Sequence, residues 1–177
     1  MVEQVITREK KLILEKDKVE EFIREHGEEF LLGLQIYADR ISPFAGKEKI
    51  DIGNGEEYVF TGIGLCSTAC TIFLDGLKEH FSQKLAVWRV HCEIKRYFPQ
   101  DVSPHQWLRF KTSDGSNYFI EPSYGQIEKR PNRIVLDNIS KENEYFPLDG
   151  SPVKTDFRYD RHPTVYNRND FGSFFGE

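Results

Sequence analysis

Three residue types that act together in covalent catalysis occur in order along the middle of the chain: Cys66, His105 and Glu121. Cys66 follows Gly64, where an apolar pattern of helical spacing begins. The N–H groups and the dipole of a helix N-terminus stabilise a thiolate, which is the nucleophilic form of cysteine. A histidine can accept the thiol proton and later return it to a leaving group, and a carboxylate can orient that histidine. The three residues therefore predict a thiol nucleophile with its base and an orienting acid.

The cysteines also allow two other interpretations. Free cysteine is among the most buried residue types, and we expect Cys70, one turn after Cys66, and Cys92, in a strand pattern, to belong to the core. A zinc site formed by the three cysteines and His91 is the second alternative. His91 and Cys92 are adjacent in a predicted strand and face opposite ways, which disfavours that site. We expect neither a metal nor a cofactor.

The elements that position these residues follow from the spacing of apolar side chains. Asp17 and Glu20 form a capping pair at the start of a helical region that reaches Tyr37, and Gly27 is expected to break it. The remaining predictions are a loop over residues 42–55, a helix over 66–81 and strands over 86–94, 105–111 and 117–121.

The loop between the last two strands decides whether His105 and Glu121 share a face of the sheet. A three-residue loop, with Gly115 in the left-handed conformation, pairs Thr112 with Ser116 and places Glu121 opposite Trp107. His105 then lies diagonally across from Glu121, within reach of long side chains. A two-residue loop shifts the register by one residue and puts the two on opposite faces.

These motifs resemble those of the transglutaminase-like thiol enzymes, a group with a papain-type fold. The resemblance covers residues 60–126 and rests on Gly64-x-Cys66 before a helix, His105-Gln-Trp107 at the start of a strand, and Phe119-Ile-Glu121-Pro-Ser at the end of another. The same block also resembles the arylamine N-acetyltransferases, whose acid-bearing strand runs into a Gly-containing turn. The resemblance implies that Cys66, His105 and Glu121 form a catalytic triad.

The chain departs from that pattern in two respects. The third member of the triad is usually Asp or Asn, and Glu121 is one methylene longer. No side chain stands at a matching position upstream of Cys66 to stabilise an oxyanion, so the Cys66 N–H is the expected donor. Gln35 and Asn54 are the candidates for a second donor, and Trp107 is either a wall of the site or ordinary cover of the hairpin.

Composition sets the broader expectations. The 177 residues, 38% hydrophobic and 30% charged, predict a single globular domain over 1–177. Within it we expect a catalytic core at 60–126 and a C-terminal extension of loops and short strands at 127–177. A net charge of −5 argues against nucleic acid. No secretory or membrane-spanning pattern is seen, and the odd, sparse cysteines favour a reducing compartment, so we expect a cytoplasmic protein without membrane contacts.

The expected protein is an α+β, papain-like (transglutaminase-like) enzyme with helices packed on an antiparallel sheet. It transfers acyl groups through a Cys66 thioester, and its substrate is a peptide, a protein or a small amide. The acceptor is water in a protease or amidase, and an amine in a transglutaminase or an arylamine N-acetyltransferase-like acyltransferase. The alternatives are a catalytically inactive binding module of the same fold, and an enzyme whose tail occupies its own cleft through Phe171, Phe174 and Phe175.

Overall fold

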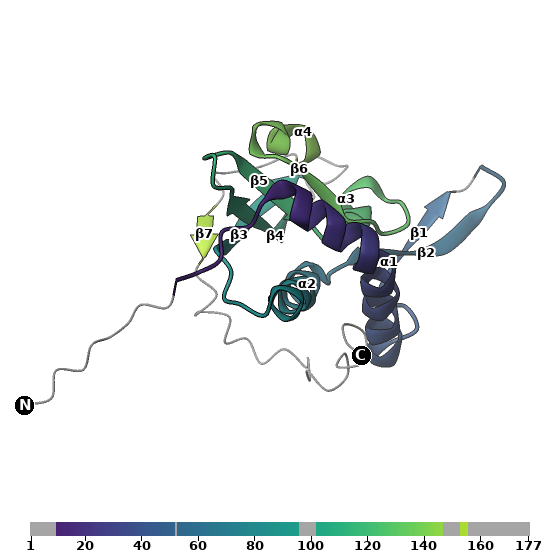
Figure 1. The fold of residues 1–177 in the computed structure, drawn as a ribbon. Coiled ribbons are helices and arrows are strands. Elements are labelled where there is room, and N and C mark those ends of the chain that lie inside the picture. Colours follow the sequence, from purple (N-terminus) through teal and green to yellow (C-terminus); the bar gives the residue numbers. More distant parts are fainter. Residues whose placement is uncertain (1–9, 52, 96–101, 147–152, 156–177) are drawn as a thin grey trace, which may run out of the picture.

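The computed structural model describes residues 10–51, 53–95, 102–146 and 153–155 (Figure 1). Its elements, in chain order, are α1 (Lys16–Ile41), β1 (Gly46–Asp51), β2 (Glu56–Ile63), α2 (Cys66–Phe81), β3 (Val87–Lys95), β4 (Val102–Lys111), β5 (Asn117–Glu121), α3 (Gly125–Glu128), β6 (Val135–Asn138), the 3-10 turn η1 (Ile139–Lys141), α4 (Glu142–Tyr145) and β7 (Val153–Thr155).

Five strands form one antiparallel sheet in the order β6-β5-β4-β3-β7. Strands β1 and β2 form a separate hairpin that projects from the body of the molecule (Figure 1). The protein is therefore α+β with helices and antiparallel sheets, as the sequence predicted. The strand predictions for 86–94, 105–111 and 117–121 are confirmed, with β4 beginning three residues earlier than expected.

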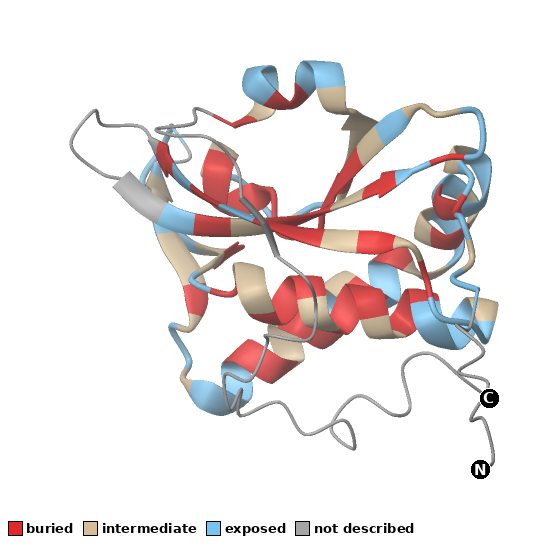
Figure 2. Ribbon diagram, turned by 90° about the vertical axis from the view of Figure 1, so that its left-hand side faces the viewer, coloured by how far each residue is buried: buried red, intermediate tan, exposed pale blue. Residues whose placement is uncertain are grey.

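The two faces of the five-stranded sheet bury different side chains because successive residues of a strand alternate between faces. Val87, Leu108, Phe110 and Ile120 pack with α1 and α2 on one face. The opposite face carries a second apolar cluster, which includes Val90, Cys92, Trp107, Phe119, Val135 and Phe146. Buried residues accordingly run along α2 and through the strands (Figure 2).

Helix α1 differs from its prediction at two places. It is continuous through Gly27, which is buried, and a Cβ there would lie 3.4 Å from the Ile134 side chain. The glycine therefore does not break the helix. The helix begins at Lys16 with Glu15 as its N-cap, so the predicted Asp17–Glu20 cap is wrong. Asp17 lies inside the first turn, where an acidic residue is favourable to the helix dipole.

The prediction of a loop over residues 42–55 is also wrong, because β1 occupies Gly46–Asp51. Its register with β2 runs from Gly46 opposite Ile63 to Asp51 opposite Glu56. Most side chains of β1 are polar, so the strand lacks the apolar alternation by which half-buried strands are recognised.

Residues after Gly125 extend the sheet on both sides. Strand β6 pairs with β5, and β7 pairs with β3, which agrees with the short strands expected for this region. The helical turns α3, η1 and α4 were not predicted. The aromatic tail residues Phe171, Phe174 and Phe175 lie outside the described residues.

Candidate active site

The hairpin between β4 and β5 has the register that brings His105 and Glu121 onto one face. Leu108 pairs with Ile120 and Lys111 with Asn117, and the Thr112 N–H donates to the Ser116 carbonyl at 2.9 Å. Gly115 has φ +90°, which only glycine adopts readily. The three-residue loop is therefore confirmed.

His105 and Glu121 meet inside the protein. The His105 Nε2 atom lies 2.5 Å from Glu121 Oε2, and the two residues are 1% and 0% exposed. Pairing of β4 with β5 covers Leu108 to Lys111, so His105 stands beyond the end of β5. Glu121 is the last residue of β5 and reaches His105 diagonally, and its extra methylene suits this geometry.

Cys66 supplies the third contact. It is the first residue of α2, as predicted, and the interaction of its side chain with His105 is one of the causes that raise the pKa of that imidazole. Because Glu121 occupies Nε2, the Nδ1 atom remains for the sulfur. Cys66 is half-buried, whereas His105 and Glu121 are fully buried. Cys66 is therefore the least buried residue of the three.

The electrostatics of the group favour a charged imidazole. Burial by itself lowers the pKa of His105, because a charged ring loses its hydration. The negative charge of Glu121 and the hydrogen bonds with Cys66 and Glu121 outweigh that effect and raise the pKa of His105 to about 10. At neutral pH the imidazole is therefore protonated, beside the Glu121 carboxylate and Cys66.

A buried network holds the carboxylate in place. Glu121 Oε1 accepts hydrogen bonds from the Ser123 N–H at 2.7 Å and from the Ser123 hydroxyl at 2.9 Å. The Gln126 side-chain amide donates to the Ser123 hydroxyl at 2.7 Å. All three residues are at most 5% exposed. Sequence reasoning missed Ser123 and Gln126, although a serine two residues after an acid at a strand end is a typical turn signal.

Aromatic side chains pack against the His105 imidazole on its face of the sheet. The Trp107 ring is stacked on His105 with centroids 5.9 Å apart, and Phe146 lies 5.8 Å from the imidazole. Trp107 is 0% exposed and donates its indole N–H to Glu142 at 2.5 Å. Trp107 is therefore a buried support for His105. No local pattern in the sequence could have indicated Phe146, which comes from the end of α4.

One of the two candidates for a second oxyanion donor lies far from Cys66. Asn54 is in the turn between β1 and β2, whereas Cys66 follows the opposite end of β2. The eight residues of β2 span roughly 24 Å at about 3.4 Å per residue, so Asn54 as a site residue is wrong. Gln35 lines a hollow on α1 with Phe60 and Asn132, and Cys66 does not line that hollow.

The other cysteines have structural contacts. Cys70 is 0% exposed and its thiol lies 3.4 Å from the Gln106 carbonyl, while Cys92 is opposite His105 in the sheet and 6% exposed. Both are core residues, as expected. Over the described ranges, no group of three or more His, Cys, Asp or Glu residues is arranged to hold a metal ion.

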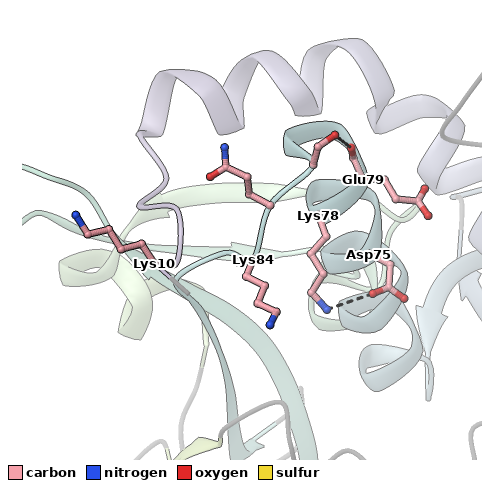
Figure 3. A pocket seen from close by; sticks show the side chains of 7 residues that line it. Lys10, Asp75, Lys78, Glu79 and Lys84 are labelled. Atoms are coloured by element: carbon pink, nitrogen blue, oxygen red, sulfur yellow. Dashed lines mark hydrogen bonds and ion pairs between the residues drawn. The ribbon is translucent and has the colours of Figure 1, made fainter. Parts of the chain in front are cut away.

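A large hollow on the protein lies away from Cys66, His105 and Glu121. An open hollow of about 810 Å³ lies at the C-terminal end of α2, where Lys10, Lys78 and Lys84 line it with Asp75 and Glu79 (Figure 3). Helix α2 places that end about 22 Å from Cys66, at 1.5 Å per residue. The hollow is therefore separate from the contacts of Cys66, His105 and Glu121.

Comparison of the chain with protein-family models, with curated proteins and with solved structures gives no match. The case for a function therefore comes from the residues of this chain. Within the described part of the chain, none of the helices combines the length and the apolarity that crossing a bilayer requires.

Proposed function

We propose that this protein is a thiol acyl-transfer enzyme with a papain-like (transglutaminase-like) arrangement of Cys66, His105 and Glu121. The observation that carries the proposal is the continuous chain of contacts from Cys66 to His105 to Glu121 to Ser123, in which Cys66 is the one residue that is not fully buried. A buried ion pair and its supporting network are costly to assemble, and catalytic sites are where such shifted groups concentrate.

The first half of the reaction acylates Cys66. The thiolate attacks the carbonyl carbon of an amide or ester, and the carbonyl electron pair moves onto oxygen. The Cys66 N–H lies in the first turn of α2, where N–H groups have no partner within the helix, and it can donate to that oxyanion. The intermediate then collapses to a thioester as the bond to the leaving group breaks, and His105 gives its proton to the leaving amine or alkoxide.

The second half returns the enzyme to its starting state. Neutral His105 removes a proton from the acceptor, which attacks the thioester carbonyl and releases the sulfur as a thiolate. Water as acceptor gives a carboxylic acid, as in a protease or amidase, and an amine gives a new amide, as in a transglutaminase or acyltransferase. Glu121 keeps Nε2 protonated throughout, so that Nδ1 is the atom that exchanges protons with substrate.

The direct experiment is to trap the thioester. A 4-nitrophenyl ester, mixed with the folded protein, should release one equivalent of nitrophenolate in a burst and leave one acyl group on Cys66 by peptide mass mapping. Cys66→Ser should fold and lose the burst, and Cys92→Ser should keep it. A folded protein with no burst, or with acyl groups distributed over all three cysteines, contradicts the proposal and favours an inactive binding module.

A further inference from the structure

A buried arginine connects the two elements that carry Cys66 and His105. Arg89 lies near the start of β3 and is 2% exposed, on the sheet face covered by α2. Its guanidinium donates to the Ser67 hydroxyl at 3.2 Å, to the Gln106 side-chain carbonyl at 3.2 Å and to the Thr71 hydroxyl at 2.7 Å. Two of these partners belong to α2 and the third belongs to β4.

The partners of Arg89 are next to the reactive residues. Ser67 follows Cys66 directly, and Gln106 follows His105 directly. Thr71 is one turn along α2 from Ser67, so both hydroxyls lie on one side of the helix. Arg89 pairs with Leu108 in the sheet, which puts Gln106 at the diagonal position that a long side chain reaches.

Other contacts hold the same junction. The Thr71 hydroxyl donates to the Ser67 carbonyl at 3.0 Å, which turns its lone pairs toward Arg89. The Cys70 thiol lies 3.4 Å from the Gln106 backbone carbonyl. The first two turns of α2 are thus linked to Gln106 of β4 directly, through the Cys70 thiol and the Gln106 carbonyl, and indirectly, through Arg89 and the Gln106 side chain.

We infer that Arg89 is a positioning residue, which fixes the start of α2 against β4 so that the Cys66 sulfur stays in contact with His105. This inference depends on the proposed function. Arginine suits this task because its planar fork directs several N–H groups at once, whereas a lysine ammonium is a single point on a flexible stem. A shift of about 1 Å between reacting groups can reduce the rate roughly 100-fold.

Arg89→Met tests the inference by alkylation of the folded protein with iodoacetamide at pH 6, with mass-spectrometric mapping of the three cysteines. We expect the rate at Cys66 to fall roughly 10- to 100-fold, while Cys70 and Cys92 stay slow. Arg89→Lys should give an intermediate rate, because lysine replaces part of the contact set. Leu77→Ala is the matched control, since it opens a cavity at the other end of α2 and lowers the melting temperature without touching the junction.

Three outcomes overturn the inference. One is a folded Arg89→Met protein with the wild-type rate at Cys66. Another is faster labelling of all three cysteines, as expected if Arg89 only prevents opening of the fold. The third is a wild-type protein in which Cys66 is no faster than the others, which removes the proposed function as well. If Arg89→Met does not fold, Thr71→Val replaces it: a several-fold slower rate at Cys66 supports the inference, and an unchanged rate overturns it.

Discussion

Replacement of Glu121 with glutamine keeps the size of the side chain and removes its charge. In the wild-type protein both donors to Oε1 have fixed directions: one is the Ser123 backbone N–H, and the other is the Ser123 hydroxyl, which accepts from Gln126. A glutamine must therefore keep its oxygen toward Ser123, and its NH₂ group faces His105. The imidazole then accepts at Nε2 and carries its proton on Nδ1, with no charged partner to hold a second proton.

The expected loss of activity follows from that change of tautomer. In the serine-protease triad the equivalent loss of charge lowers kcat by about 10⁴, and we expect Glu121→Gln to approach that value. Alkylation gives a measure that needs no substrate. An ordinary thiol, with a pKa near 8.5, is about 0.3% ionised at pH 6. The thiolate of such a thiol is more nucleophilic than that of a more acidic thiol, which offsets part of the loss. Loss of the ion pair should therefore slow the alkylation of Cys66 by iodoacetamide by up to roughly 100-fold.

The assay compares Glu121→Gln with wild type and with Glu128→Gln, a half-buried carboxylate paired with Arg133, as the matched control. Folding should change by about 1–3 kcal/mol, the cost of one altered buried contact, and the melting temperature by roughly 5 °C. If Glu121→Gln folds and Cys66 reacts at the wild-type rate, then Glu121 is a structural residue at the end of β5 and the assignment of the triad fails.

Three further measurements test the same site. Ser123→Ala removes one of the two donors to Glu121 and should slow Cys66 alkylation about tenfold or less, since the Ser123 N–H remains; a rate at or below that of Glu121→Gln contradicts this ranking. The pKa of His105 rises from 6.5 to about 10 on folding, so its contribution to stability is fully present below pH 6.5 and is lost as pH rises to about 10; the stability difference between wild type and His105→Asn, from urea titrations, should shrink over that window, and a constant difference contradicts the charged imidazole. Phe146→Ala removes a fully buried ring that is stacked on Trp107 at 4.6 Å and should cost about 3–5 kcal/mol, read as a lower melting temperature; a change below about 1 kcal/mol contradicts the packing of α4 on the site.

The parts of the fold that the sequence predicted are those with a local signal. Apolar spacing located α2 and β3, and Asp114-Gly115 located the hairpin that sets the register of His105 and Glu121. That register depends on one count of loop residues, and the hydrogen bond from the Thr112 N–H to the Ser116 carbonyl shows that the loop has three. The placement of His105 and Glu121 on one face of the sheet could therefore be predicted from the sequence alone.

The parts that were missed depend on tertiary contacts. Gly27 is a helix breaker by propensity, yet it is buried inside α1, which continues through it. Strand β1 carries too few apolar residues for a period-two pattern to be seen. The supports of the site come from separate elements: Arg89 on β3 and Phe146 after α4 act across distances along the chain that no local pattern reports.

The central claim is that Cys66 is a thiolate nucleophile paired with His105. Competitive labelling of the folded wild-type protein with iodoacetamide at pH 6, followed by peptide mapping, tests it most directly. The account predicts that Cys66 is labelled first, that Cys70 and Cys92 react slowly because they are buried, and that His105→Ala slows labelling at Cys66 alone. Equal, slow labelling of all three cysteines, or a Cys66 rate that does not depend on His105, would contradict it.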